Sequence, residues 1–477
     1  MKSNSCIIGR QKEQEKLQKI VESKKSELLA LYGRRRVGKT FLIKEYFNHQ
    51  FAFRITGLAN ADTSQQLFNF DTEINKQSPL VFETSSKNWL IAFQRLMLHL
   101  ESINHQEKKV VFIDELPWFD TKASDFMIGL EHFWNSWASY RKDILLIVCG
   151  SAASWMINEL INNTGGLHNR VTQKMKICPF NLQETEAMLL AQNGAFDRYQ
   201  IMQLYMTMGG IPYYLEAIQP DLSASQNIQA LFFEAGGLLR NEFLNLYRSL
   251  YQKHEVYEKI IETLSSKTAG MQRSEIIQRS GMASGGTLSK VLLDLEESGF
   301  ISSYHSLDDK LKNITYRLSD YYTSFYFKFL KDNKLQGQNA WLNMIDSPVH
   351  RVWQRFTFEQ VCLDHILPIK KALGISGIQS QHHSWRGAIE EKKAQIDLLI
   401  DRRDQVINLC ECKFHLDTFT IDKAYSEQLR SKITTFKAAT QTKKAVYLTM
   451  ITSYGITKNQ YANVLIQNDI TMDDLFQ

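Results

Sequence analysis

Short apolar runs in the first third of the chain have the length and composition of buried parallel strands. They occupy residues 27–32, 110–113 and 144–149. A helical pattern over residues 41–47 follows the first run after a glycine-containing loop. The pattern predicts a multidomain α/β chain that begins with a parallel-sheet domain.

From about residue 251 the pattern changes to short amphipathic helices. Their apolar positions recur at helical spacing over residues 257–264, 274–277 and 284–295. Residues 299–301 end the third helix and start a hairpin, which turns at Asp308 and Asp309 and returns through residues 316–318. Three helices and a hairpin in this order predict a winged helix-turn-helix.

The third of these helices has two possible roles. In one, it enters a DNA major groove, and Lys290 is its main cation. In the other, it packs internally or against a protein, because Asp294, Glu296 and Glu297 repel phosphate. Both remain open.

The aromatic run at residues 321–329 also has two interpretations. Interleaved rings and cations can stack on single-stranded nucleic acid, but this run holds a single lysine. The spacing of its rings favours a buried helix.

The last part of the chain predicts a helix followed by a strand pair. Val352, Phe356, Leu363 and Ile366 follow a helical stripe, and Glu359 falls in the same stripe. A carboxylate on an apolar face is costly unless it is paired or bound to a metal. Residues 394–400 and 406–414 read as two strands joined by a turn.

The loop after the first strand has the pattern G-x-x-x-x-G-K-T in the strand–loop–helix context that phosphate binding requires. Its glycines let backbone N–H groups curl around phosphates, Lys39 can reach the β- and γ-phosphates, and the Thr40 hydroxyl can ligate Mg²⁺. The predicted nucleotide-binding residues are Gly33, Arg34, Arg35, Arg36, Val37, Gly38, Lys39 and Thr40.

An acidic pair follows the second apolar strand. Asp114 is predicted to hold Mg²⁺ through water, and Glu115 to polarise the attacking water as general base. The third strand is followed by Ser151, which either touches the γ-phosphate or caps the next helix. Together these features predict ATP binding and hydrolysis.

Length and composition set the class. The 477 residues are too many for one core, and 44% hydrophobic with 22% charged residues is a globular composition. A dispersed net charge of +5 permits nucleic-acid contact without arguing for it. The six cysteines lack zinc-site spacing, and no apolar run is long enough for a signal peptide or a membrane span, so we expect a reduced, cytoplasmic protein.

The chain resembles the AAA+-related, STAND-type P-loop ATPases of prokaryotes, in particular the archaeal and bacterial family that fuses such a module to a restriction-endonuclease-like C-terminal domain. Gly9 and Arg10, with Glu13 and Leu17, are similar to the family's N-terminal segment. Residues 209–215 (GGIPYYL) resemble its G-G-x-P-x-Y-L motif.

The resemblance implies further roles in nucleotide binding. It implies that Gly9 and Arg10 lie near the adenine, and that Pro212 lies against the nucleotide and senses its state. Read alone, the Pro212 segment is a turn between two helices. Arg170 is implied to stabilise charge on the transferring phosphoryl group, in cis or from a neighbouring subunit, and a surface ion pair is the alternative.

Glu359, Asp397, Glu411 and Lys413 resemble the PD-(D/E)xK nuclease core. In that core Asp397 and Glu411 would hold Mg²⁺, Lys413 would orient the water or neutralise negative charge, and Glu359 would complete the metal shell. The usual proline before the first acid is absent, since Gln395 and Ile396 stand there. A chance surface ion pair, or a domain that has lost catalysis, is the alternative.

These features predict four domains: a P-loop ATPase core at 1–180, a helical lid at 181–249, a winged helix-turn-helix at 250–335 and a nuclease-like domain at 336–477. The expected function is an ATP-hydrolysing switch that controls a Mg²⁺-dependent nuclease-like domain, with DNA as the expected substrate. The alternative is an ATP-driven signalling or DNA-binding switch with an inactive C-terminal domain. Expected partners are ATP and DNA, with a homo-oligomer or a partner protein possible and no membrane.

Overall fold

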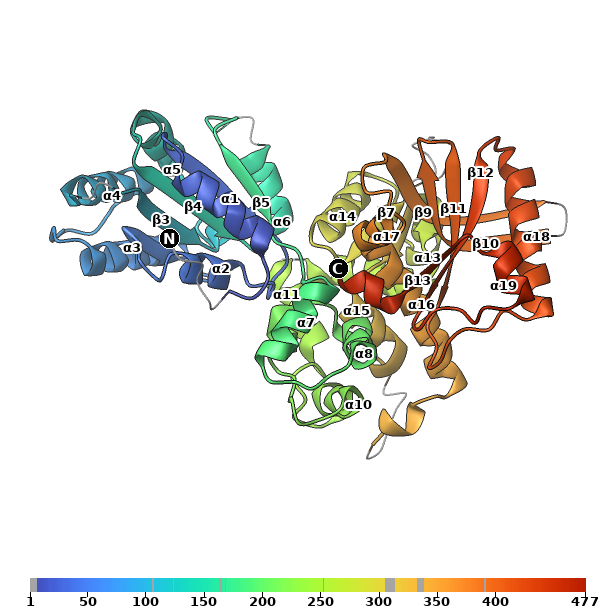
Figure 1. Cartoon of the computed structure of the whole chain (residues 1–477). Helices are drawn as coiled ribbons and strands as arrows, with labels where there is room; N and C mark the ends of the chain where they lie inside the picture. Colours follow the sequence, from blue (N-terminus) through green and yellow to red (C-terminus); the bar gives the residue numbers. More distant parts are fainter. Residues whose placement is uncertain are drawn as a thin grey trace. The chain divides into compact units, whose positions relative to one another are not determined.

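The computed structural model describes residues 7–104, 107–122, 124–162, 165–167, 169–251, 253–304, 314–332, 339–389 and 392–477. The predicted turn at Asp308 and Asp309 lies outside these residues, as does Cys6. The chain divides into two compact units (Figure 1). The first comprises Met1–Pro179, Leu250–Gln252 and Lys290–Gly299, and the second comprises Phe180–Ser249, Lys253–Ser289 and Phe300–Gln477.

The first unit is built on a five-stranded parallel sheet with the order β2-β3-β4-β1-β5. Its strands are β1 (Glu27–Tyr32), β2 (Phe53–Thr56), β3 (Lys109–Asp114), β4 (Ile144–Gly150) and β5 (Gln173–Lys176). Its longer helices are α1 (Gln11–Val21), α2 (Lys39–Tyr46), α3 (Thr63–Gln77), α4 (Trp89–Ser102) and α5 (Phe126–Ser136). The predicted α/β class with a parallel sheet is confirmed.

The strand order brings distant loops to one edge of the sheet. β4 pairs with both β1 and β3, so the segments that follow these three strands leave the sheet side by side. Behind them, aromatic rings of α4 and α5 fill the core, with the Trp89 and Phe126 ring centroids 4.8 Å apart. β3 ends at Asp114, and Glu115 follows it with a left-handed φ of 50°, as expected for an acidic pair at the end of an apolar strand.

The second unit begins with a group of short helices. They are α7 (Leu182–Ala191), α8 (Arg198–Met208), α9 (Pro212–Leu215), α10 (Ala224–Ile228), the π-helical η4 (Gln229–Phe233) and α11 (Glu242–Leu250). Gly209 ends α8 with a φ of 69°, and Pro212 starts α9. The motif at 209–215 is therefore a turn between two helices in its local structure.

Helices and strands occur in the predicted order between residues 254 and 318. They are α12 (His254–Ser265), β6 (Met271–Gln272), α13 (Arg273–Ser280), α14 (Gly286–Glu297), β7 (Ile301–Tyr304) and β8 (Thr315–Leu318). The strands form a small antiparallel sheet with the order β6-β8-β7. One expectation about α14 is wrong: Asp294 is buried rather than exposed, whereas Lys290 is exposed.

The aromatic run forms α15 (Tyr321–Phe325) and the π-helical η6 (Tyr326–Leu330). Tyr322, Phe325 and Phe329 are buried, and the Phe325 ring lies 5.2 Å from that of Trp341. The expectation of a buried helix is confirmed for these rings.

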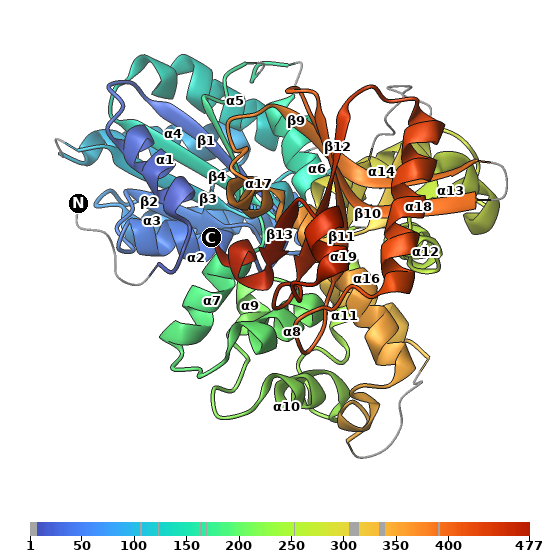
Figure 2. The ribbon, with the colours of Figure 1, turned by 45° about the vertical axis from the view of Figure 1, so that its right-hand side comes forward.

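The C-terminal part holds a mixed sheet with the order β13-β12-β11-β10-β9, in which β9 to β11 are antiparallel and β11 to β13 parallel (Figure 2). Its strands are β9 (Ser380–Ile389), β10 (Lys392–Arg402), β11 (Val406–Lys413), β12 (Ala445–Thr452) and β13 (Asn468–Thr471). The accompanying helices are α16 (Pro348–Asp364), α17 (Ile366–Ala372), α18 (Lys423–Thr440), α19 (Gln460–Leu465) and the 3₁₀ helix η8 (Met472–Phe476).

Two helices cover this sheet. α18 packs on β9 and β10 and shares a core with Leu409 and Met450, whereas α16 packs on β10 and β11. One residue of the predicted stripe on α16 is wrong, since Val352 is 50% exposed and Trp353 is buried, whereas Leu363 is buried as predicted. Glu359 is buried as expected. No helix among the described residues combines the length and apolar character needed to cross a bilayer.

The turn at Gly210, in the second unit, packs so closely on neighbouring backbone that it leaves no space for a side chain. A Cβ at Gly210 would lie 1.9 Å from the Phe180 carbonyl oxygen, and the Gly210 carbonyl accepts a hydrogen bond from the Phe180 N–H. We expect Gly210→Ala to lower the free energy of unfolding by about 2–3 kcal/mol, because backbone must move to admit the methyl group. Chemical denaturation measures this change.

Gly236→Ala is the matched control, because no atom lies within 4 Å of a Cβ there. Its effect should stay below about 0.5 kcal/mol. Equal stability of the two variants would contradict the close contact at Phe180.

Candidate functional site

The loop between β1 and α2 has the backbone that its glycines predict. Gly33 has a φ of 144°, and a Cβ there would lie 2.2 Å from the Ile177 carbonyl oxygen. Gly38 is the N-cap of α2 and has a φ of 87°, and no described atom lies within 4 Å of the position of a Cβ there. The left-handed backbone conformation, and not a lack of space, therefore favours glycine at this position. The loop therefore leaves the N-terminus of α2 open to bind an anion.

Lys39 and Thr40 tie this loop together. The Lys39 ammonium donates to the carbonyl oxygens of Gly33 at 2.9 Å and Arg34 at 2.8 Å. The Thr40 hydroxyl donates to Asp114 Oδ2 at 2.8 Å. A hydroxyl and a carboxylate in contact beside a buried ammonium are suited to a hydrated Mg²⁺ and the phosphates that it accompanies.

Glu115 is oriented by Ser151. The Ser151 hydroxyl donates to Glu115 Oε2 at 2.9 Å, and the Ser151 N–H donates to the same oxygen at 3.3 Å. The residue at the helix N-cap is Ala152, so the Ser151 hydroxyl does not cap the following helix. The structure thus gives Ser151 a contact with the predicted base, which sequence reasoning missed; its contact with the γ-phosphate stays a prediction.

The segment at Gly9 and Arg10 adjoins the loop. Both residues have left-handed φ values, 64° and 57°, and Arg10 Nη2 donates to the Val37 carbonyl oxygen at 2.9 Å. The structure therefore brings these two predicted residues to the phosphate loop.

Two other predicted residues are not brought to the loop by a described contact. Arg170 lies exposed in the turn before β5, and Pro212 belongs to the second unit. Their roles in nucleotide binding stay predictions.

Two residues behind the acidic strand were also not predicted. Cys149, in β4, is fully buried, and burial together with the nearby charge of Asp114 raises the pKa of its thiol. Gly57 donates its N–H to the Asp114 carbonyl oxygen, and a Cβ there would lie 2.7 Å from the Glu115 carbonyl oxygen. Close packing on the strand end explains both residue types.

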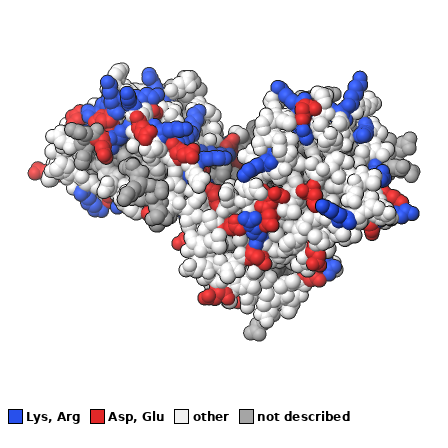
Figure 3. All heavy atoms as spheres, in the orientation of Figure 1, with Lys and Arg blue, Asp and Glu red and all other residues white. Residues whose placement is uncertain are grey.

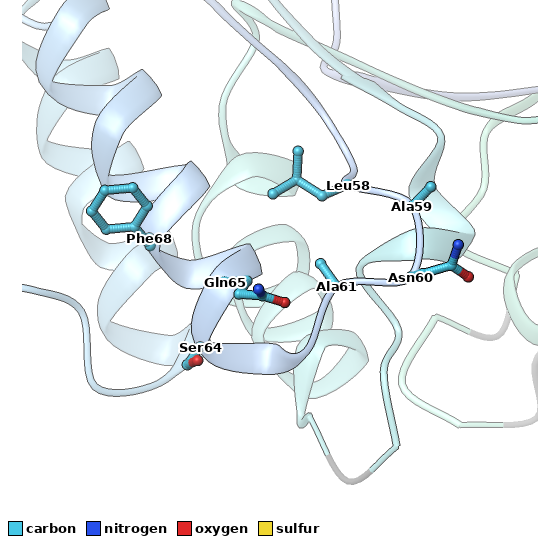
Figure 4. Close-up of a pocket in the computed structure, with 7 residues that line it drawn as sticks. All are labelled: Leu58, Ala59, Asn60, Ala61, Ser64, Gln65 and Phe68. Carbon is cyan, nitrogen blue, oxygen red and sulfur yellow. The ribbon is translucent and has the colours of Figure 1, made fainter.

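A surface pocket beside this region is distinct from the phosphate loop. It is formed by the segment after β2 and the first turns of α3 (Figure 4). Its lining is uncharged: Leu58, Ala59, Asn60, Ala61, Ser64, Gln65 and Phe68. A lining without cations does not suit a polyphosphate, so this pocket is not the candidate nucleotide site.

Three buried carboxylates form a second cluster in the other unit. Glu359 comes from α16, Asp397 from β10 and Glu411 from β11, and their exposed fractions are 3%, 1% and 1%. β10 pairs Leu398 with Cys410, and the next residues along this register are Asp397 and Glu411. The pairing ends there, where Asp397 Oδ2 instead accepts a hydrogen bond from the Cys412 N–H at 3.0 Å.

Two carboxylate oxygens of this cluster have no hydrogen-bond donor among the residues that the structure describes. They are Asp397 Oδ1 and Glu359 Oε1, and the nearest cation to the latter is Arg355, whose Nε lies 3.5 Å away. Burial and, second, the negative charge of Asp397 raise the pKa of Glu359 to about 7. Burial and Asp397 raise the pKa of Glu411 in the same way. Asp397 therefore acts on both of the other carboxylates.

Glu411 is paired with cations. Lys432 Nζ lies 2.6 Å from Oε1 and Lys413 Nζ lies 3.6 Å from Oε2, while the Tyr425 hydroxyl donates to Oε2 at 3.4 Å. Lys432 and Tyr425 were not predicted, although a spacing of seven residues on one helix puts them on the same face.

A divalent cation fits part of this cluster. The two carboxylate oxygens without donors are suitable ligands. As arranged, however, no group of three or more His, Cys, Asp or Glu side chains in the described ranges is placed to hold a metal ion.

Comparison with known proteins supports an ATPase activity for the part of the chain that holds the first site. Residues 7–218 match the family model of an ATPase domain found predominantly in Archaea. This span contains every predicted nucleotide-binding residue. The chain is therefore an ATP-hydrolysing enzyme with a P-loop NTPase-like α/β fold, and its cofactor is a nucleotide.

Proteins that match a larger part of this chain give less information about its function. An uncharacterized protein of Methanocaldococcus jannaschii, MJECL04, is 22% identical over 371 residues, which cover 76% of this chain and 78% of that protein. A Walker-type ATPase of Pyrococcus abyssi has a TM-score of 0.48 at 16% identity and covers 68% of this chain and 96% of that one. The ORC2 protein of Aeropyrum pernix, solved with ADPNP and ADP, has a TM-score of 0.43 at 16% identity, covering 71% and 95%. Similarity this weak assigns no substrate or partner.

Hydrogen bonds to the carbonyl oxygens of Gly33 and Arg34 hold the buried Lys39 ammonium within the phosphate loop. We expect Lys39→Ala to reduce ATP hydrolysis by about 100-fold or more, since charge stabilisation of the transferring phosphoryl group is lost. A phosphate-release assay measures this. Lys44→Ala, at the other end of α2, is the control and should stay within about twofold of wild type.

Glu115→Gln should bind ATP normally and lose hydrolysis by about 100-fold, because an amide cannot accept the proton of the attacking water.

Ser151→Ala should lower kcat by about tenfold, the cost of one hydrogen bond to a charged group, and leave KM unchanged. Steady-state kinetics and binding of a fluorescent ATP analogue separate the two effects. A Ser151→Ala variant with raised KM and normal kcat would contradict the positioning of Glu115.

Proposed function

We propose that this ATPase is an ATP-controlled switch of the AAA+-related STAND type whose C-terminal part is a Mg²⁺-dependent nuclease-like domain acting on DNA. One observation carries the proposal: two buried carboxylate oxygens, on Asp397 and Glu359, lack hydrogen-bond donors beside the lysine of an E-x-K strand. A buried carboxylate without a donor is costly, and a cation ligand would offset that cost.

The proposed domains are the ATPase core at 1–180, the lid at 181–249, the winged helix-turn-helix at 250–335 and the nuclease-like domain at 336–477. Support for the winged helix comes from α12, α13 and α14 with the sheet of β6, β8 and β7. Its role is open to protein contact as well as DNA, because Glu275 of α13 pairs with Lys267 and Arg279 and so neutralises both cations.

At the nuclease-like site, Asp397, Glu411 and Glu359 would hold Mg²⁺, which supplies polarisation of the scissile phosphate and a more acidic bound water. Lys413 would neutralise charge that develops on the phosphate, and its Nζ already lies 3.6 Å from Glu411. At the ATP site, Thr40 and Asp114 would hold the Mg²⁺ of the nucleotide. Arg170 is exposed, which suits an action in cis or on a neighbouring subunit.

Contacts within the second unit support a coupling of its turn to the carboxylate cluster. The Tyr205 hydroxyl donates to the Phe180 carbonyl oxygen at 3.1 Å, beside Gly210. The Tyr205 ring lies 5.2 Å from that of Tyr321, whose hydroxyl donates to Asp364 Oδ2 at 2.6 Å. Asp364 ends α16, the helix that carries Glu359, so a nucleotide-driven movement of the turn would reach the cluster through packed groups.

The DNA substrate is proposed from the chemistry of the cluster rather than from surface charge. On the face that Figure 3 shows, lysines and arginines are mixed with aspartates and glutamates in both units. Such a surface gives weak general attraction for a polyanion, so recognition would depend on the site itself.

The test is cleavage of plasmid and linear DNA with Mg²⁺ or Mn²⁺. Asp397→Asn should abolish cleavage, because one of the three carboxylates that would hold the cation is replaced by an amide. Asp404→Asn, in the exposed turn between β10 and β11, is the control and should cleave normally. Cleavage by the Asp397→Asn variant at the wild-type rate would contradict the proposed site.

A second candidate function is an ATP-driven signalling or DNA-binding switch with an inactive C-terminal domain. The pairing of Glu411 with Lys432 at 2.6 Å favours it, because a carboxylate satisfied by a lysine needs no metal. Absence of cleavage by wild type under every nucleotide condition, with DNA binding that still responds to ATP, would support this candidate over the first.

A further inference from the structure

Helix α18 contributes a lysine to the carboxylate cluster that lies outside the E-x-K pattern. Lys432 Nζ is 2.6 Å from Glu411 Oε1, whereas the motif lysine, Lys413, is 3.6 Å from Oε2. The Lys432 side chain is 24% exposed, and Glu411 is 1% exposed. Lys432 is thus the closer of the two cations and reaches the carboxylate from the solvent side of a buried group.

Other cations surround the same cluster. Arg355 Nε lies 3.5 Å from Glu359 Oε1, and the charges of Glu359 and Asp397 act on Arg386 of β9. Burial lowers the pKa of Arg386, and these two carboxylates oppose that shift. The cluster thus has lysine and arginine side chains beside its carboxylates, and these are the residue types that bind a polyanion such as a phosphodiester strand.

The oxygens without donors show where a divalent cation would enter. Asp397 Oδ1 and Glu359 Oε1 are buried and accept no hydrogen bond from the described part of the chain, while Glu411 is already paired with Lys432. A divalent cation that uses Glu411 as a third ligand must compete with the Lys432 ammonium for the same carboxylate. An ammonium displaced from Glu411 is then available to another anion.

We propose that Lys432 is a phosphate-binding residue of this site: it pairs with Glu411 in competition with a divalent cation and, once displaced, pairs with a phosphate oxygen of the bound strand. This inference rests on the proposed nuclease-like function and assigns to it a residue from α18. Lys432 thereby links occupancy by the cation to binding of the strand.

The first experiment titrates Mn²⁺ into nucleotide-free protein by calorimetry. Lys432→Met should bind Mn²⁺ about tenfold more tightly than wild type, because the competing charged hydrogen bond is gone. Lys432→Arg, which keeps the charge, should stay near wild type. Lys437→Met, exposed in the last turn of the same helix, is the matched control.

The second experiment measures binding of a labelled duplex oligonucleotide by fluorescence anisotropy in Ca²⁺ over a range of salt concentrations. Lys432→Met should bind several-fold more weakly, with a slope of log affinity against log salt smaller by about 1, as expected for one lost phosphate contact. Lys437→Met should change neither quantity. A residue with a purely structural role would not change the salt slope.

The outcomes separate the two proposals. If Asp397→Asn binds Mn²⁺ as wild type does, the nuclease-like site itself is wrong. If Mn²⁺ binding requires Asp397 but Lys432→Met leaves Mn²⁺ affinity or the salt slope unchanged, only the role of Lys432 is overturned. Should Lys432→Met fail to fold, Lys432→Gln carries the same expectations, since it also removes the charge.

Discussion

The hydrogen bond from Thr40 to Asp114 joins segments 74 residues apart, and the rest of the ATP site depends on the strand order that makes it possible. β4 lies between β1 and β3, so the phosphate loop, the acidic pair and Ser151 all emerge at one edge of the sheet. Ser151 can then hold Glu115, and Arg10 can hold the loop through the Val37 carbonyl. A single topological constraint thus assembles the side chains for hydrolysis.

The second unit meets a different constraint, the cost of burying carboxylates. Glu411 meets it with Lys432 and Lys413, while Asp397 and Glu359 each keep one oxygen without a donor. Both arrangements occur in one cluster, which is why an active and an inactive C-terminal domain remain the two candidate functions. The competition between a lysine and a divalent cation for Glu411 connects the two.

Local patterns predicted the ATP site well because its signal is contiguous: glycines, lysine and threonine stand in one loop, and a strand and a helix flank it. The Ser151 contact with Glu115 was missed because it depends on which strands are neighbours. Lys432 was missed because it lies 21 residues from Glu411 and meets it only when α18 packs on the sheet. Val352 was misplaced because apolar spacing alone does not decide which of two adjacent apolar residues is buried, and Trp353 takes the buried position.

The central claim is that the nucleotide in the ATPase domain controls the carboxylate cluster. The most direct test measures Mn²⁺-dependent DNA cleavage in ATP, in ADP and without nucleotide, for wild type and for Glu115→Gln. The account predicts different rates in ATP and ADP for wild type, and a Glu115→Gln variant that keeps its ATP rate throughout the reaction because it does not hydrolyse the nucleotide. Equal rates under all three conditions, in a protein that cleaves DNA and hydrolyses ATP, would contradict it.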